Sequence, residues 1–259
     1  MARNFHFSAI AWRSEVGLHR ESNEDSGLIA EDLIAVADGM GGYVGGEIAS
    51  RTVITELAKV HQLIIDPEID NDSKEDIYSS SISHMDEAIS IAAADNPHLN
   101  GMGTTLTSLA ILGENAVLLH VGDSRAYRIR GKKITQISHD HTVVQELIDQ
   151  GRLKPEEVAE HPQRSLLTQA LMGNRTIETA LVAFPLEIGD IFLVCSDGLT
   201  TVVDESKIAN AFSGDLKHGV DSLIELTYKN GAPDNVTIIA AEIGEMKSGI
   251  TPTRIGAAS

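Results

Sequence analysis

The chain has 259 residues, of which 42% are hydrophobic, so it can bury a core of its own and is not a disordered protein. Its 38 acidic and 20 basic side chains leave a formal net charge of −18, which argues against nucleic acid or a membrane surface as a partner, because phosphate groups would be repelled. The one cysteine, Cys195, excludes an internal disulfide framework and a zinc site of the CxxC type, and it predicts a reducing compartment, the cytoplasm.

Apolar patterns in the first half of the chain predict groups of strands and helices. A short run of Leu, Ile, Val and Ala at 33–37 predicts a strand, and helical spacing predicts helices at 48–65 and 77–94, with an acidic loop at 66–76 between them. Strands are expected next at 106–112, 116–121, 126–129 and 134–137, with Gly131 in the hairpin turn between the last two.

The second half begins with residues 143–174, whose short helical pieces around two prolines suit a mobile cover over a site. A strand at 191–195, helices at 205–212 and 216–228, and a strand at 236–243 follow, and Asp204 is expected to cap the first of these helices. The last residues, 247–259, are small and polar and are expected to fray. This irregular order favours a layered α+β domain over a doubly wound parallel sheet.

Four of the predicted strands carry an aspartate at one end. These acids are Asp38, Asp123 and Asp197, which follow apolar runs, and Asp234, which precedes one; Glu24 and Asp25 add two more before a further strand. One Asp-Gly pair needs no explanation beyond turn formation. If the strand ends converge, however, the carboxylates repel one another, and divalent cations would neutralise them. Ligands that are all oxygen favour magnesium, manganese or calcium over zinc or copper.

Arg20 stands just before the acidic triplet Asn23-Glu24-Asp25. An arginine beside carboxylates is either a salt-bridge partner or a bidentate clamp on a phosphate group. The glycine-rich stretch 39–46 is not a Walker loop, because Glu47 stands where that loop needs a lysine. We expect these glycines to let a backbone carbonyl approach a metal ion.

With these residues in place, the sequence resembles the metal-dependent protein phosphatases of the serine/threonine type 2C family, in their compact bacterial form, from about residue 5 to residue 243. Seven short motifs occur in the order of that family. They are Gly17-x-x-Arg20-x-x-Asn23-Glu24-Asp25, Ala37-Asp38-Gly39-Met40-Gly41-Gly42, Gly103-Thr104-Thr105, Val121-Gly122-Asp123-Ser124-Arg125-Ala126-Tyr127, Asp140-His141-Thr142, Cys195-Ser196-Asp197-Gly198-Leu199 and Asp234-Asn235-Val236-Thr237.

The resemblance implies an α+β fold, a central antiparallel β-sandwich with helices on both outer faces. It implies a single phosphatase catalytic domain over 1–245, with a flap at about 143–174, and a short polar tail at 246–259. Two manganese or magnesium ions would occupy the core site, with a weaker third ion beside them.

The resemblance also assigns roles to individual residues. Asp38 would bridge two ions. Asp197 and Asp234 would complete one ion, Glu24 and the carbonyl of Gly39 the other, and Asp123 with Asp197 would bind the third. Asp25 would hold metal-bound water, and Arg20 would hold the substrate phosphate. Asn235 either orients a metal ligand or serves turn formation alone.

The predicted function is hydrolysis of phosphoserine and phosphothreonine in proteins by a hydroxide that two metal ions activate. The implied partners are phosphorylated proteins and a cognate serine/threonine kinase, and the chain is expected to be a monomer. The group that protonates the leaving oxygen stays open: Met40 stands where some relatives carry a histidine, and His141 has either that role or a structural one. The alternatives are a catalytically silent regulatory module, a calcium-stabilised interaction module and a phosphatase of small esters.

Overall fold

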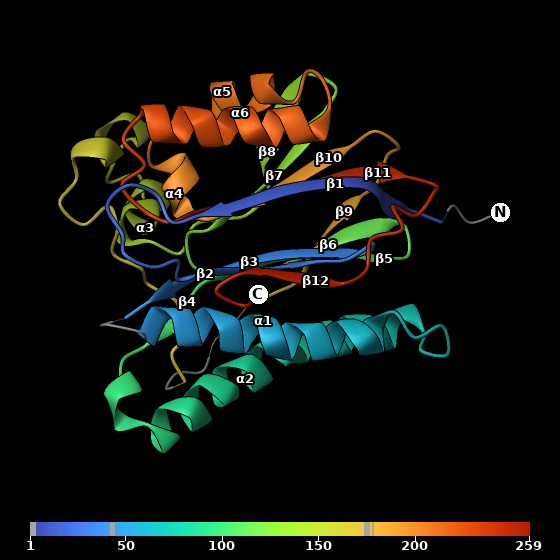
Figure 1. Cartoon of the computed structure of the whole chain (residues 1–259), viewed down its shortest axis with the longest axis horizontal. Coiled ribbons are helices and arrows are strands. Elements are labelled where there is room, and N and C mark those ends of the chain that lie inside the picture. The colour runs from blue at the N-terminus through green and yellow to red at the C-terminus, as the bar shows by residue number, and fades with distance from the viewer. Residues whose placement is uncertain (1–3, 42–44, 174–176, 178) are drawn as a thin grey trace.

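The computed structural model describes residues 4–41, 45–173, 177 and 179–259. In this part of the chain, two antiparallel sheets pack face to face and helices cover both outer faces, so that the layers follow the order α-β-β-α (Figure 1). The predicted class, an α+β protein built on a central antiparallel sandwich, is confirmed.

The sandwich consists of a five-stranded and a seven-stranded sheet. The first sheet has the order β1 (His6–Glu15), β11 (Val236–Gly244), β10 (Ile191–Cys195), β7 (Arg125–Arg130) and β8 (Lys133–Gln136). The second has the order β12 (Thr253–Gly256), β2 (Asp25–Ile29), β3 (Leu33–Met40), β5 (Leu106–Leu112), β6 (Asn115–Val121) and β9 (Val182–Pro185), and β4 (Gly103–Thr104) pairs with the end of β3.

The helices divide between the two outer faces (Figure 1). On one side α1 (Gly45–Ile64) and α2 (Asn71–Asp95) cover the second sheet; on the other, α4 (Asp197–Thr200), α5 (Glu205–Ala211) and α6 (Leu216–Lys229) cover the first. The remaining helical pieces are α3 (Val143–Asp149) and the 3₁₀ turns Pro97–Leu99 and Pro155–Glu160. None of the helices in the described residues has the length and apolar character that crossing a bilayer requires.

The core is divided into three apolar clusters because each sheet buries both of its faces. Strand β3 shows the reason, since successive side chains of a strand point to opposite faces. Leu33 and Ala35 pack in the cluster with α1 and α2, whereas Ile34 and Val36 pack in the cluster between the two sheets. A strand buried on both faces reads as an unbroken apolar run, which is why sequence analysis located β3.

Two details near the helices differ from expectation. Residues 71–76 belong to the first turns of α2 and not to a loop, because Asp70 accepts a hydrogen bond from the backbone N–H of Ser73 at 2.9 Å and so caps the helix. Asp204 stands at the N-cap of α5 as predicted, but its side chain makes no capping hydrogen bond.

The prediction that residues 246–259 form a frayed polar tail is wrong. Thr253–Gly256 is strand β12, which extends the second sheet by pairing with β2. Ile255 and Ala258 are buried, at 7% and 4% exposure. The sequence does not predict this strand because it contains one isolated apolar residue, Ile255, and not an apolar run. The strand forms because it pairs with β2, which is distant in sequence. The long strand β1 also went unpredicted.

The core between the sheets supplies a stability test. Ile239→Ala removes a fully buried side chain on β11, and we expect the free energy of unfolding to fall by about 2–5 kcal/mol. Ile91→Ala, on the outer face of α2 with 57% of the residue exposed, is the matched control and is expected to change it by less than about 1 kcal/mol. Urea unfolding followed by circular dichroism measures both. Equal losses in the two variants would contradict this placement of the core.

Candidate active site

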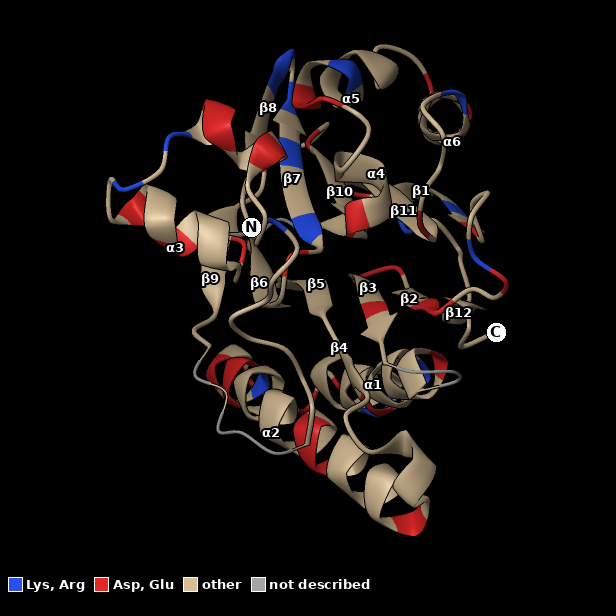
Figure 2. Ribbon diagram, turned by 90° about the vertical axis from the view of Figure 1, so that its left-hand side faces the viewer, with Lys and Arg blue, Asp and Glu red and all other residues tan. Residues whose placement is uncertain are grey.

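Strand ends of both sheets meet at one cleft of about 230 Å³. Figure 2 shows acidic segments of β2, β3 and α4 at this same end of the sandwich. The described residues that line the cleft are Arg20, Glu24, Asp38, Gly39, Met40, Gly41, Thr105, Asp123, Ser165, Leu167, Asp197, Asp234 and Asn235. All six residues predicted as metal ligands are therefore brought together, with Arg20 beside them. Ser165 and Leu167 are additions, because nothing in their local pattern marks them.

Asp38 is held by its backbone at the end of β3. Its N–H donates to the hydroxyl of Thr105 at 3.0 Å, and its carbonyl accepts from the hydroxyl of Thr104 at 2.9 Å. The hydroxyls of both threonines are thus bonded to the backbone of Asp38. Both backbone groups of Asp38 are therefore occupied, while its carboxylate stays directed at the cleft.

Asp25 lies directly opposite Asp38 in the pairing of β2 with β3, and it is fully buried. One carboxylate oxygen, Oδ2, accepts from the hydroxyl of Ser196 at 2.7 Å. The other, Oδ1, has no hydrogen-bond partner among the described residues. Ser196 also accepts from the backbone N–H of Thr237 at 2.9 Å, so this serine connects three strands at the site. Sequence analysis quoted Ser196 within a motif but gave it no role.

Asn235 fastens the loop that carries Glu24. Its side-chain oxygen accepts from the N–H of Glu24 at 2.8 Å, and its amide nitrogen donates to the carbonyl of Ser22 at 2.9 Å. Gly198 packs against the Asn235 backbone so closely that a Cβ atom at this glycine would lie 1.9 Å from the carbonyl oxygen. Only glycine therefore fits at this position of α4, where the helix contacts the residue before β11.

Arg20 forms an ion pair with Asp234, with 2.7 Å between Nη2 and Oδ2. Its side chain remains 48% exposed, so the pair lies at the mouth of the cleft. The structure thus shows the salt-bridge arrangement that the sequence left open, and it occupies one oxygen of a predicted metal ligand.

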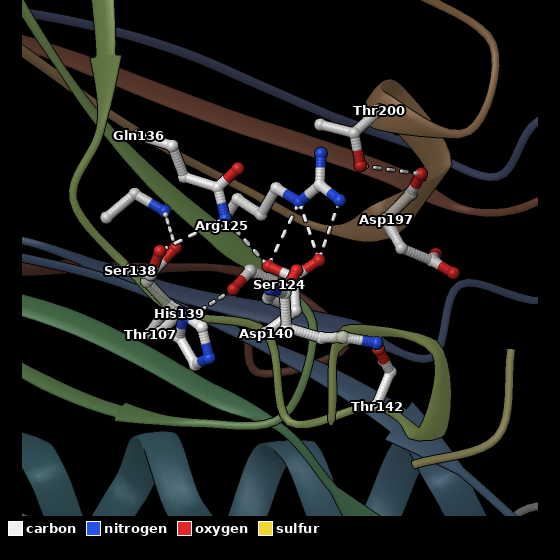
Figure 3. Close-up of polar contacts among 12 residues, drawn as sticks. Thr107, Ser124, Arg125, Gln136, Ser138, His139, Asp140, Thr142, Asp197 and Thr200 are labelled. Atoms are coloured by element: carbon white, nitrogen blue, oxygen red, sulfur yellow. Dashed lines mark hydrogen bonds and ion pairs between the residues drawn. The ribbon is translucent and has the colours of Figure 1, made fainter. Parts of the chain in front are cut away.

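Arg125, which stands near Asp123 in the chain, forms its ion pair with a carboxylate other than the predicted metal ligands. Figure 3 shows its guanidinium directed at Asp140, with an Nη2–Oδ2 distance of 2.6 Å, and Gln136 donates to the same carboxylate at 2.8 Å. This ion pair connects the start of β7 to the loop that follows β8. The positive charge of Arg125 is therefore paired outside the cleft.

The acids of the site have unusual protonation equilibria. Burial raises the pKa of Asp25 to about 7 and that of Asp123 to about 7, and the charges of neighbouring aspartates add to both shifts. Burial and the charges of Asp25, Asp197 and Asp123 raise the pKa of Asp38 well above its usual range. Burial likewise raises the pKa values of Asp197 and Glu24. The cleft thus resists carrying its full negative charge.

These residues fit divalent metal ions. Within the described ranges, no three Asp, Glu, His or Cys side chains are close enough to hold one ion as they stand. The donors are all oxygens, one buried carboxylate oxygen of Asp25 lacks a partner among the described residues, and added positive charge would favour the ionised forms of these acids. Hard cations such as manganese or magnesium match this donor set.

The two histidines beside the site are structural. Nδ1 of His141 accepts from the backbone N–H of Gly122 at 3.0 Å, and its ring stacks on that of His120 with 5.0 Å between centroids. Burial lowers the pKa of His141 and lowers that of His120 to about 3, so both are neutral near pH 7. His141 is not among the described residues that line the cleft, and this placement favours its structural role over proton donation.

A two-sheet sandwich with an acid-lined, oxygen-only cleft and an arginine at its mouth defines a metal-dependent hydrolase of phosphate esters. Comparison with protein families gives the identification: the model "Protein phosphatase 2C" matches residues 21–222. The chain therefore belongs to the protein phosphatase 2C family. The predicted family is confirmed.

Curated relatives carry the same activity in their names. The chain is 41% identical to the serine/threonine protein phosphatase PstP of Mycobacterium tuberculosis over 261 residues, which cover 100% of this chain and 50% of PstP. It therefore spans about half the length of that relative. It is 33% identical to the protein phosphatase PhpP of Streptococcus pneumoniae over 245 residues, covering 91% of this chain and 98% of PhpP.

Solved structures of relatives superpose well on the sandwich. The crystal structure of the M. tuberculosis phosphatase PstP/Ppp has a TM-score of 0.83 at 42% identity, covering 90% of this chain and 97% of that one. The catalytic domain of PstP in complex with two manganese ions also has a TM-score of 0.83, at 37% identity, covering 93% of this chain and 99% of that one.

The raised pKa of Asp25 makes stability depend on pH. Between about pH 4 and pH 7 the folded chain keeps a proton that the unfolded chain has lost, so unfolding releases protons and the free energy of unfolding falls as pH rises. Asp25→Asn removes this titration, and we expect a flatter dependence over that range. Urea unfolding in excess chelator at several pH values measures it, with the exposed Asp72→Asn on α2 as control. A slope in Asp25→Asn equal to that of the unmodified chain would contradict the assignment.

Proposed function

We propose that this chain removes phosphate from phosphoserine and phosphothreonine in proteins, with Glu24, Asp38, Asp123, Asp197 and Asp234 as the side chains that hold the metal ions. The observation that carries the proposal is their convergence on one cleft with Arg20 at its mouth. When bound, two divalent ions supply a hydroxide nucleophile at neutral pH and positive charge for the phosphoryl oxygens.

The positions of the acids support an assignment of each acid to particular metal ions. Asp38 lies at the end of β3 in the middle of the cleft and would be shared by both core ions. Asp197 and Asp234, from the first sheet side, would hold one, and Glu24 with the carbonyl of Gly39 would hold the other. Asp123 and Asp197 would hold a weaker third. Asp25, behind Asp38, would orient water through its free oxygen, Oδ1.

Arg20 is the group that would receive the substrate phosphate. A guanidinium binds phosphate with two parallel hydrogen bonds, and half of the Arg20 side chain is exposed at the mouth of the cleft. Its partner in the structure, Asp234, holds the guanidinium at that position. A phosphate group entering the cleft would compete with Asp234 for the arginine.

Residues 143–174 would act as the flap that shapes access for protein substrates. Ser165 and Leu167 reach the cleft, and Leu167 forms a β-bridge with Thr142. At the far end, one carboxylate oxygen of Asp86 on α2 accepts from the N–H groups of Met172 and Gly173 at 2.8 and 2.7 Å. Both ends of the segment are therefore fastened, while residues 162–166 between them are exposed.

Phosphoprotein substrates follow from the family, whereas several finer features stay predictions. These are a cognate serine/threonine kinase as the opposing enzyme, a monomeric state, a location in the cytoplasm and a catalytic domain at 1–245. The comparison supports activity of this chain by itself, because PhpP is matched over 98% of its length by 91% of this chain.

Phosphate release from a phosphothreonine peptide tests the proposed function. We expect release with manganese, none with excess EDTA, and a loss of about 100-fold or more in Asp38→Ala because an electrostatic group at the reacting centre is removed. The exposed Asp72→Ala is the control with normal activity. Folded, manganese-loaded protein that releases no phosphate would instead support a silent regulatory module.

The role of Arg20 is tested by the split between KM and kcat. Arg20→Ala is expected to raise KM for the phosphopeptide by about 10-fold, because a charged hydrogen bond to phosphate is lost, while manganese content stays the same. Arg13→Ala removes an arginine of similar exposure that pairs with Asp221 on the outer surface, and it should leave KM unchanged. An unchanged KM in Arg20→Ala would remove the clamp from the mechanism.

A further inference from the structure

Strand β12 occupies the edge of the second sheet beside β2, and Figure 1 shows it at the border between this sheet and α1. It is fastened by side chains of both layers. Ile255 packs in the cluster between the sheets, Ala258 packs in the cluster on the side of α1 and α2, and Arg254 donates to the hydroxyl of Thr55 on α1 at 3.3 Å. The strand is therefore a built part of the domain.

Beyond its last paired residue, β12 contacts the backbone of Asp25. The N–H of Ala257 donates to the carbonyl oxygen of Asp25 at 2.8 Å. Gly256 passes so close that a Cβ atom there would lie 2.2 Å from the same oxygen and 3.0 Å from the hydroxyl of Ser14. With φ at +66°, Gly256 also has a backbone conformation that other residues rarely adopt.

These contacts leave Asp25 held at both of its backbone polar groups. Its N–H donates to the side-chain oxygen of Asn23 at 3.1 Å, and its carbonyl is held by Ala257. Its Cα lies opposite that of Asp38 in the strand pair, so a shift of β2 at this point moves the buried carboxylate of Asp25 relative to Asp38. Without β12, β2 would be the edge strand, and the carbonyl of Asp25 would lose this partner.

From this geometry we propose that β12, through Gly256 and Ala257, is a positioning element of the metal site. It fixes the position of the Asp25 carboxylate relative to Asp38, and this position in turn affects the affinity of the cleft for manganese. The inference rests on the proposed function, since it assumes that the acids of the cleft hold divalent ions. The proposal thus gives a functional role to residues of the segment 246–259, which the sequence analysis placed outside the catalytic domain.

Two substitutions in the full-length chain test it. Gly256→Ala forces a methyl group against the carbonyl of Asp25, and Ala257→Pro removes the N–H that this carbonyl accepts. Supporting groups behind metal ligands typically contribute 10- to 100-fold to affinity, so we expect each variant to weaken manganese binding by about 10-fold. Calorimetric titration with manganese measures affinity without reference to turnover, and kcat at saturating manganese should return to within about two-fold of the original value.

Gly249→Ala is the matched control. Gly249 lies in the same C-terminal segment with φ at +73°, but a Cβ atom there would meet nothing within 4 Å. It introduces the same kind of backbone strain without touching Asp25, and we expect manganese affinity within about two-fold of the original. Circular dichroism confirms that each variant is folded before titration.

The outcomes separate the inference from the proposed function. If the unmodified chain binds manganese and a folded Gly256→Ala or Ala257→Pro variant binds it equally well, the positioning role is overturned while the phosphatase stands. Should Gly256→Ala fail to fold, Ala257→Pro alone decides in the same way. If the unmodified chain binds no manganese, the proposed metal site is overturned, and the inference with it.

Discussion

Repulsion among buried carboxylates is the constraint on which this structure depends. Asp25, Asp38, Asp123 and Asp197 are placed where burial and mutual charge raise their pKa values, so their ionised forms are disfavoured without added positive charge. Arg125, a half-buried cation close in sequence to Asp123, is paired with Asp140. The charge that the cleft lacks must come from elsewhere, and divalent ions supply it in the form that phosphoryl transfer uses.

The sandwich holds this repulsive arrangement by its backbone. Thr105 holds the main chain at Asp38, Ser196 holds the carboxylate of Asp25, and Asn235 holds the loop at Glu24. All three act through uncharged hydroxyl or amide groups, so none of them brings positive charge. Two apolar cores on either side of β3 make these strand ends rigid. The free energy that places the acids therefore comes from sheet packing far from the cleft, and the carboxylates remain available for cations.

The mouth of the cleft combines elements that are distant in sequence. Arg20 comes from the loop after β1 and its partner Asp234 from the loop before β11, while Ser165 and Leu167 come from the segment between β8 and β9. Asp86 on α2 fastens the far end of that segment. On the other side of Asp25, the N–H of Ala257, which follows β12, donates to the carbonyl of Asp25. Metal binding, substrate access and the outer layers are thus connected through short chains of hydrogen bonds.

Local patterns in the sequence predicted strands such as β3, β5, β6, β10 and β11, the acids at strand ends and an all-oxygen ligand set, but not β1 or β12. These features depend on the alternation of apolar residues and on turn chemistry, which act within a few residues. The pairing of Asp25 with Asp38, the Arg20–Asp234 ion pair and the place of β12 were decided by tertiary structure alone. The ion pair and β12 join segments far apart in the chain, and β12 takes its stability from the neighbouring strand, so no local pattern encodes them. Asp25 and Asp38 are closer in sequence, but they face each other only through the register of the β2–β3 hairpin.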